Sequence, residues 1–367
     1  MADPRVEKLA QVLVNYSLRI KKGDRFRIAA NAVAAPLVRE LYRETLKAGG
    51  LPFTRIDLDG IDELLLKYGS DEQISDIPPF LTAENEQVDA MIRIIGEGNS
   101  RSLSGVDAAK VAKRRDALRP FQEMQMRRSA EGTLNWCVTL FPTNSGAQDA
   151  DMSLSDYEDF VYGACLVDQD DPVGEWEKVH TEQQRIADFL MTKDTIRLVG
   201  KDTDLTYRVG GRTWVNASGR RNFPDGEVFT GPIEDSANGV IRYSFPTIFS
   251  GREADDVRLV FKDGKVVEAT AGKGQDILDS LLELDPGARY LGEVAFGLNY
   301  GITRFSRNIL FDEKIGGTVH LALGAGYPDT GSTNRSALHW DMICDMREES
   351  EVYADGELIY RNGKFII

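Results

Sequence analysis

The sequence predicts two domains, an α/β domain with a mostly parallel sheet over residues 1–191 and a mainly antiparallel α+β domain over residues 192–367. Strand-like and helical segments alternate through the first half, as is typical of a parallel sheet with crossover helices. Val88–Ile95 is a near-continuous apolar run, as expected for a strand buried on both faces. After residue 191, short strands are joined by Asp-Gly and Asn-Gly pairs, which favour antiparallel hairpins.

The elements of the first domain follow from the spacing of apolar residues. Helical spacing predicts helices over residues 5–19, 35–48, 63–68, 104–128, 151–166 and 172–191. Strand patterns predict strands over residues 25–30, 52–59, 88–95 and 134–141. Pro120 should kink or break the helix over residues 104–128, because proline lacks the N–H that a helix interior needs.

The second domain is expected to consist of short strands and hairpins. The hairpin signals are Asp263-Gly264, Asp355-Gly356 and Asn362-Gly363. One helix interrupts the strands at Gln275–Glu283 and ends at a Pro-Gly turn.

Two features of the first domain resemble binding motifs without matching them. The loop Gly96–Ser100 follows a strand and precedes a helix, but it fits neither common phosphate-binding pattern, so a plain turn is the better interpretation. Seven basic residues lie in the helix over residues 104–128, and we interpret them as a solvated face.

Composition excludes several classes of protein. The net charge of −15 and the pI of about 4.8 argue against nucleic acid and anionic membranes as partners. Three widely spaced cysteines predict no disulfide framework and hence a reducing compartment. The N-terminus has no signal-peptide pattern, and no apolar run has the length of a membrane span. We therefore expect a cytoplasmic protein.

Two of the three histidines lie close together in the sequence, in the stretch TVHLALGAGYPDTGSTNRSALHWDMICD. His320 and His339 each sit in an apolar run with strand character, and a Gly-, Pro- and Ser-rich loop joins the runs. Because side chains alternate along a strand, His339 and Asp341 should share a face. Imidazole and carboxylate are ligands that zinc or cobalt accepts. The simpler alternative for each histidine is a hydrogen-bonded core residue, and the third, His180, is expected to have a surface or capping role.

Two glutamates extend this set. Glu227 follows a Pro-Asp-Gly turn at the start of a strand, and Glu293 lies between a glycine and an apolar strand. Each alone would suit a hydrated surface charge. With His320, His339 and Asp341 they make five nitrogen or oxygen ligands, a number that suits two metals bridged by a carboxylate and a water.

Several ordered motifs resemble the M29 family of thermophilic metalloaminopeptidases, the aminopeptidase T group. They are GEVFTGPIEDSANG, LGEVAFGLNYGI, ILFDEKIGGTVHLALGAGYP and HWDMICDM, together with the N-terminal stretch VNYSLRIKKGDRFRIAANAVAAPLVRELYRETLKAGG. The resemblance implies a two-domain subunit, a homodimer, peptide substrates and two divalent metal ions, which would be zinc, cobalt or manganese. It implies the five residues above as metal ligands, and it adds Tyr327 as an active-site residue.

The resemblance also implies a mechanism, in which a water activated by two metals attacks the scissile carbonyl at the N-terminal residue of a peptide. Tyr327 would hydrogen-bond the developing oxyanion or orient the substrate. Glu227 or Glu293 would carry a proton to the leaving amine. The loop between Tyr327 and His339 looks shorter than in the family's bacterial aminopeptidases, so it could give the pocket a different shape.

Three other functions stay open at this stage. A different metal-dependent hydrolase would use the same ligands, and substrate profiling would separate the two. A non-catalytic small-molecule-binding protein would use the α/β domain and be indifferent to His320→Ala. A metalloenzyme that has become a scaffold would not need all five ligands. Asp312 and Glu313 could add negative charge near the metals, although a turn is the simpler interpretation.

Overall fold

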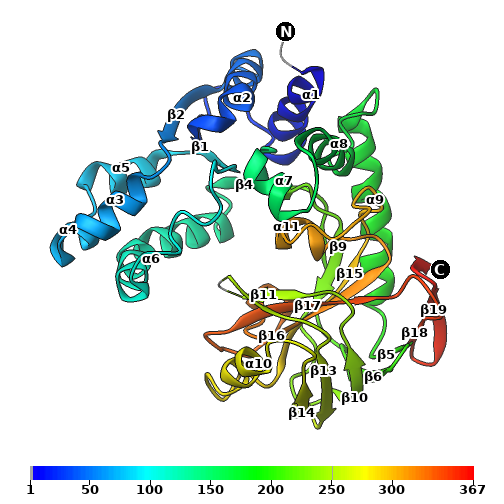
Figure 1. The fold of residues 1–367 in the computed structure, drawn as a ribbon. Coiled ribbons are helices and arrows are strands. Elements are labelled where there is room, and N and C mark those ends of the chain that lie inside the picture. Colours follow the sequence, from blue (N-terminus) through cyan, green and yellow to red (C-terminus); the bar gives the residue numbers. More distant parts are fainter. Residues whose placement is uncertain (1–2, 250) are drawn as a thin grey trace. The chain divides into compact units, whose positions relative to one another are not determined.

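The computed structural model describes residues 3–249 and 251–367, which fall into two compact units (Figure 1). Unit 1 comprises Met1–Trp176 and Gly219–Phe223, and unit 2 comprises Glu177–Ser218 and Pro224–Ile367. Unit 1 holds a parallel sheet with helices, and unit 2 is mainly antiparallel, so the predicted fold class is confirmed. Helix α9 (Pro172–Leu190) begins in unit 1 and continues into unit 2, and the domain boundary near residue 191 stays a prediction.

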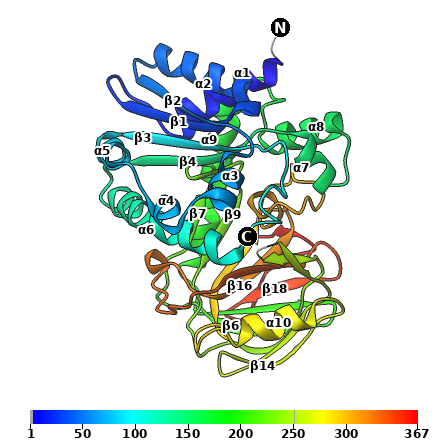
Figure 2. The ribbon, with the colours of Figure 1, turned by 60° about the vertical axis from the view of Figure 1, so that its left-hand side comes forward.

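The sheet of unit 1 has the order β2-β1-β3-β4-β8, and every neighbouring pair is parallel (Figure 2). Its strands are β1 (Arg25–Asn31), β2 (Leu51–Asp57), β3 (Ala90–Ile95), β4 (Asn135–Leu140) and β8 (Asn222–Phe223). Phe26, Ile28 and Ile92 on the inner strands are buried, whereas β2 lies at an edge and is largely exposed. The predicted strands are therefore present, and the apolar run at β3 lies in the interior of the sheet.

The helices of unit 1 largely follow the predicted ranges. They are α1 (Pro4–Val12), the π-helical turn Leu13–Ser17, the 3₁₀ turn Ala32–Ala34, α2 (Ala35–Lys47), α3 (Ile61–Tyr68), α4 (Asp71–Ser75), α5 (Pro79–Gln87), α6 (Ala108–Ala130), α7 (Asn144–Asp149) and α8 (Leu154–Ala164). The short helices α4, α5 and α7 were not predicted, because segments of five to nine residues carry too little periodicity.

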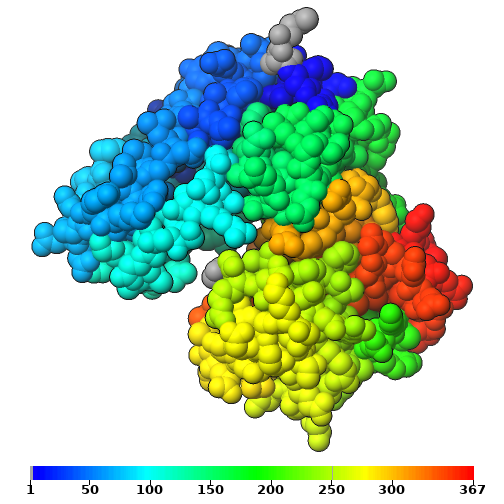
Figure 3. All heavy atoms as spheres, viewed as in Figure 1, coloured from blue at the N-terminus to red at the C-terminus, as the bar shows by residue number. Residues whose placement is uncertain are grey.

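Pro120 does not break helix α6, and the alternative of a kink stays a prediction. Pro120 lies inside a continuous helix of 23 residues. None of its residues is buried, and Figure 3 shows α6, in cyan, at the surface of unit 1. A carbonyl left without its helical donor can therefore be hydrated, which lowers the cost of the proline.

Several basic side chains of α6 bind the ends of other helices. Lys110 donates to the backbone of Gly69 at the end of α3, and Arg114 donates to two carbonyls at the end of α4. Arg128 donates to the carbonyl of Asn85 in the last turn of α5. These contacts satisfy carbonyls that have no intrahelical partner and give the basic residues a structural role.

Unit 2 is built from antiparallel sheets. One has eight strands in the order β14-β13-β10-β6-β5-β18-β19-β20, one has five in the order β17-β16-β15-β9-β7, and β11 pairs with β12. The strands are β5 (Thr195–Gly200), β6 (Thr203–Arg208), β7 (Val215–Ala217), β9 (Glu227–Thr230), β10 (Asn238–Arg242), β11 (Thr247–Phe249), β12 (Arg252–Ala254), β13 (Arg258–Lys262), β14 (Lys265–Thr270), β15 (Leu291–Gly297), β16 (Thr318–Gly324), β17 (His339–Asp345), β18 (Glu351–Ala354), β19 (Glu357–Arg361) and β20 (Lys364–Phe365). Besides α9, the helices are α10 (Gln275–Leu282), α11 (Ile309–Asp312) and the 3₁₀ turn Pro328–Thr330.

The predicted hairpins are confirmed. Asp263, Asp355 and Asn362 each have a positive φ of 47–50°, and each is followed by a glycine with a φ of 78–83°. Two successive residues with positive φ make the turn that matches the twist of paired strands. These turns join β13 to β14, β18 to β19 and β19 to β20.

One hydrophobic cluster of unit 2 contains inward-facing residues of both large sheets, α9 and α10. From the five-stranded sheet it takes Val294, Leu321, Trp340 and Met342. Since side chains alternate along each strand, the neighbouring residues of these strands lie on the opposite face, away from this cluster.

Two further expectations concern cysteines and membrane spans. Cys137, Cys165 and Cys344 are buried and unbridged, as predicted. Among the described residues, no helix combines the length and the apolar character that crossing a bilayer requires.

Candidate metal centre

Four neighbouring strands of the five-stranded sheet bring the five predicted ligands together. Glu227 begins β9, Glu293 lies on β15, His320 lies on β16, and His339 and Asp341 lie on β17. These strands are adjacent in the order β17-β16-β15-β9. The candidate centre therefore lies across one face of a single sheet in unit 2.

The register of the strands explains why these side chains share that face. Ala322 of β16 is paired with Glu293 on one side and with Asp341 on the other, and His320 is paired with Ala295. Paired residues of antiparallel strands point to the same face. The two alanines are small, so they leave room between the charged side chains above the sheet.

A β-bulge sets the direction of Glu293. The pairing of β15 with β16 shifts between Leu291 and Glu293, which leaves Gly292 as the extra residue. A Cβ on Gly292 would lie 2.3 Å from the carbonyl oxygens of Gly324 and Ala325. The glycine is required by this close approach, and the bulge turns the following glutamate onto the site face.

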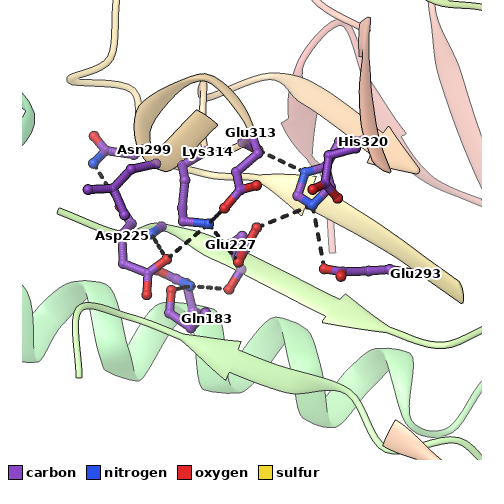
Figure 4. Close-up of polar contacts among 12 residues, drawn as sticks. Gln183, Asp225, Glu227, Glu293, Asn299, Glu313, Lys314 and His320 are labelled. Atoms are coloured by element: carbon purple, nitrogen blue, oxygen red, sulfur yellow. Dashed lines mark hydrogen bonds and ion pairs between the residues drawn. The ribbon is translucent and has the colours of Figure 1, made fainter. Parts of the chain in front are cut away.

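The ligand atoms form two groups of three that share Glu293. His320 Nε2 lies 3.4 Å from Glu227 Oε2 and 3.5 Å from Glu293 Oε1 (Figure 4). His339 Nε2 lies 3.5 Å from Glu293 Oε2 and 3.4 Å from Asp341 Oδ1. Within each group the ligand atoms all lie within 4.8 Å of one another. Glu293 thus presents one oxygen to each histidine, as a bridging carboxylate would.

Both imidazole rings are oriented by backbone carbonyls. His320 Nδ1 lies 2.9 Å from the carbonyl oxygen of Glu313, and His339 Nδ1 lies 2.8 Å from that of Ala325. A carbonyl can only accept a hydrogen bond, so the proton of the neutral ring belongs on Nδ1. Each Nε2 then carries a lone pair that faces the carboxylates, which is the arrangement found in metal-ligating histidines.

The site has more carboxylates than cations, and the pKa values reflect this. Burial alone would lower the pKa of His320, but Glu293 and Glu227 raise it to about 9. Burial also opposes protonation of His339, whereas its contact with Asp341 raises its pKa to about 10. Burial raises the pKa of both glutamates. Despite burial, His339 holds the pKa of Asp341 down at about 2.

The donor atoms fit a divalent cation. Glu227 Oε2 is buried and has no hydrogen-bond donor among the described residues. Contacts of 3.4–3.5 Å are long for hydrogen bonds, whereas two ligands of a tetrahedral ion with bonds of about 2.0–2.1 Å lie about 3.3 Å apart. The set of two imidazole nitrogens and carboxylate oxygens suits zinc, cobalt or manganese.

Three more charged residues lie here, of which the sequence had offered Glu313 only as an alternative to a turn. Glu313 forms a third possible ligand group with His320 and Asp341. Lys314 lies 2.8 Å from Glu227 Oε1, and Asp225 lies 3.7 Å from Lys314 (Figure 4). For Glu313 and Lys314 the available signal was the charged run Asp312-Glu313-Lys314, separated by three residues from the apolar strand that begins at Thr318. Interpreting Asp312 and Glu313 as a turn missed it, because Asp312 ends α11 while Glu313 faces the site.

Tyr327 lies at the edge of the site, and its side chain is partly exposed to solvent. Its ring centroid lies 5.3 Å from that of His339 and 5.5 Å from that of Phe229, and 44% of the residue is exposed. Burial and the charges of nearby carboxylates, among them Glu293, raise the pKa of the Tyr327 hydroxyl. The hydroxyl therefore keeps its proton at neutral pH and can act as a donor.

The loop that follows Tyr327 is fixed by two carboxylates. Glu234 accepts hydrogen bonds from the amide and hydroxyl of Thr333. Asp285 accepts hydrogen bonds from the Ser336 hydroxyl and the Ala337 amide. These contacts hold the loop at its middle and near its C-terminal end.

The third histidine does not join the centre. His180 on α9 contacts the Ser218 hydroxyl at 2.8 Å and the side-chain amide of Asn216 at 3.1 Å. It belongs to none of the possible ligand groups among the described residues.

Comparisons with known proteins add independent information. The family model described as thermophilic metalloprotease (M29) matches residues 2–365. Aminopeptidase 2 of Geobacillus stearothermophilus is 28% identical over 411 residues, with 99% of this chain and 98% of that protein covered. Aminopeptidase T of Thermus thermophilus is 27% identical over 414 residues, with the same coverage. The solved structure of wild-type AmpT from Thermus thermophilus has a TM-score of 0.86 at 23% identity and covers 99% of each chain.

Proposed function

The chain belongs to the thermophilic metalloprotease family M29, and from that premise we propose that it is a metal-dependent aminopeptidase that removes N-terminal residues from peptides. The observation that carries this proposal is the convergence of five candidate ligand side chains from four adjacent strands into two groups that share Glu293. The names of the relatives agree with a peptide substrate. The proposal includes a homodimer, which follows from the family resemblance alone.

Two divalent cations are proposed for the centre. Glu227, Glu293 and His320 would hold one, and Glu293, His339 and Asp341 would hold the other. When bound, such a pair supplies a nucleophilic water at neutral pH and polarises the scissile carbonyl.

Side chains of the protein would stabilise the carbonyl oxygen and transfer the proton. Tyr327 would donate a hydrogen bond to the carbonyl oxygen of the scissile bond, because its hydroxyl stays protonated beside the carboxylates. A carboxylate oxygen of Glu227 or Glu293 would accept the proton that the nucleophilic water loses and pass it to the leaving amine. The free α-amino group of a peptide would bind an acidic side chain or a metal at the centre, which would fix cleavage next to the N-terminal residue.

Elemental analysis combined with aminoacyl p-nitroanilide hydrolysis tests this function. We expect about two divalent cations per chain, activity that is lost on chelation, and recovery with zinc, cobalt or manganese. Substrates with a blocked amino group should not be cleaved. Bound metal without hydrolysis of any aminoacyl substrate would redirect the proposal to another metal-dependent hydrolase.

The proton-carrying role has a separate test. Glutamine at Glu227 and, separately, at Glu293 should reduce turnover even under conditions where metal remains bound. Unchanged turnover in both variants would remove this role from the mechanism.

A further inference from the structure

Lys314 is a cation enclosed among the carboxylates of the metal centre. Its side chain is fully shielded from solvent. The ammonium donates to Glu227 Oε1 at 2.8 Å and to Glu313 Oε1, and Asp225 Oδ1 lies 3.7 Å away (Figure 4). Glu227 and Glu313 accept hydrogen bonds from the ammonium, and Asp225 adds an ion-pair contact at a longer distance.

The backbone fixes where this ammonium lies. Asn299 N donates to the carbonyl of Lys314 at 3.0 Å, and the Asn299 side chain donates to the carbonyl of Asp225 at 2.8 Å. Gln183 on α9 donates to the carbonyl of Glu227 at 2.7 Å. The segments that carry the lysine and two of its carboxylate partners are therefore held by neutral donors, one backbone amide and two side-chain amides, independently of the charges.

The two oxygens of Glu227 have different partners, because Lys314 contacts one of them and the other faces His320. Oε1 accepts from the ammonium, and Oε2, which has no donor among the described residues, lies 3.4 Å from His320 Nε2. Without a partner for Oε1, the carboxylate could rotate and present either oxygen to the site. The ammonium removes that freedom before any cation arrives.

The net charge of the cluster also favours the binding of cations. Five carboxylates surround the centre, namely Asp225, Glu227, Glu293, Glu313 and Asp341. With Lys314 they leave four negative charges when all are ionised, which two divalent cations would neutralise. A buried charge is costly unless it is paired, so this balance favours an occupied centre.

We propose that Lys314 is a positioning residue that holds Glu227 and Glu313 by one oxygen each and so prepares the centre for divalent cations. The inference rests on the proposed function in that it requires a centre that binds such cations. In this role Lys314 acts only through the carboxylates that it contacts. Its effect is exerted through the geometry of Glu227, the carboxylate beside His320, and of Glu313.

The test compares metal binding in chelator-stripped protein and in two variants. In Lys314→Met the chain length is kept and the donor is lost, so we expect the affinity for Zn²⁺ in calorimetric titration to fall about 10- to 100-fold, the range for partners that orient metal ligands. The double variant Lys314→Met with Asp225→Asn removes one charge of each sign. It should show the same loss if positioning, rather than total charge, is what the lysine supplies.

A second readout separates positioning from a purely structural role. Zn²⁺ should raise the Tm of the Lys314→Met protein by less than it raises the Tm of the unaltered protein, because binding stabilises the folded state in proportion to the logarithm of affinity. If Lys314 had only a structural role, Lys314→Met would have a lower Tm both with and without Zn²⁺, and the increase caused by Zn²⁺ would be the same as in the unaltered protein. Lys193→Met is the matched control, since Lys193 pairs with Glu357 elsewhere in unit 2.

The outcomes are distinct. If Lys314→Met does not fold, the charge-compensated double variant carries the test. Zn²⁺ affinity within about threefold of the unaltered protein in the folded variant would overturn the proposal, and so would recovery of affinity in the double variant. An unaltered protein that binds two cations but cleaves no aminoacyl substrate would overturn the proposed function and leave the role of Lys314 standing.

Discussion

Both units bury a cation beside a five-stranded sheet, but its surroundings differ. In unit 1, Arg27 on β1 is 7% exposed and lies 2.8 Å from Glu84 and 3.0 Å from the side-chain oxygen of Asn85. One cation there meets one carboxylate and a neutral amide. In unit 2, Lys314 meets Glu227 and two further carboxylates, and two more lie across the same sheet face.

This difference separates a balanced ion pair from a cluster with more carboxylates than cations, which is the composition expected of the proposed cation site. The pair in unit 1 is balanced in charge, because Arg27 and Glu84 neutralise each other. The cluster in unit 2 is incomplete, and its histidines compensate by having a higher pKa. Groups whose pKa is shifted by burial together with specific charges are concentrated at functional sites. The imbalance of charge, more than the burial of charge, therefore identifies the functional region.

Removal of the shared ligand should have the largest effect. In Glu293→Gln both ligand groups lose a carboxylate oxygen, so we expect kcat/KM for an aminoacyl p-nitroanilide to fall at least about 10³-fold, the upper end of the loss found for single groups that stabilise an oxyanion. Metal content should fall in elemental analysis. Glu268→Gln, on the exposed strand β14, is the control and should change neither quantity. Full activity in Glu293→Gln would contradict the site assignment.

Breaking the ion pair of unit 1 should affect stability alone. Arg27→Met leaves Glu84 without its main partner, and removal of one member of a buried pair costs about 3 kcal/mol. Denaturant unfolding should show that loss. Metal content per folded chain should stay the same, and Arg25→Met, at an exposed position of the same strand, should unfold like the unaltered protein. Loss of metal in Arg27→Met would mean that the two regions are coupled.

A smaller effect is expected at the open edge of the centre. Tyr327→Phe removes only a hydroxyl, and because the residue is half exposed we expect kcat to fall about 10- to 100-fold, less than for an enclosed oxyanion donor. Metal content should not change, because Tyr327 belongs to neither ligand group. Phe229→Leu tests whether the neighbouring ring merely supports Tyr327, and it should change kcat less. An unchanged kcat in Tyr327→Phe would exclude its hydroxyl from the reaction.

The sequence predicted those features of the fold and the site that depend on a single segment of the chain. The alternation of β17 placed His339 and Asp341 on one face, and the Asp-Gly and Asn-Gly pairs marked real hairpins. The register between strands cannot be obtained from one sequence, so the pairing of Ala322 with both Glu293 and Asp341 became visible only in the structure. The enclosure of Lys314 was missed for the same reason, because its partner Glu227 is 87 residues away.

The pH dependence of stability in the metal-free protein should distinguish the carboxylate cluster of unit 2 from the ion pair of unit 1, although the expected effect is small. The pKa of His320 is about 9 and that of His339 is about 10 in the folded, metal-free chain, against about 6.5 for an unperturbed histidine. A pKa that is higher in the folded state means that protons stabilise folding. This contribution is complete below about pH 6.5 and is lost as the pH rises through 9 to 10.

The Tm of chelated protein should therefore decline by a few degrees between pH 7 and pH 10, whereas protein saturated with zinc should lack this part of the decline, since its histidine Nε2 atoms would bind no proton. The difference between the two curves is the quantity to measure, because lysine and tyrosine titration affects both forms. In Arg27→Met the difference should persist, as no histidine lies in that ion pair. Parallel curves for chelated and zinc-saturated protein would show that cations and protons do not compete for the histidines.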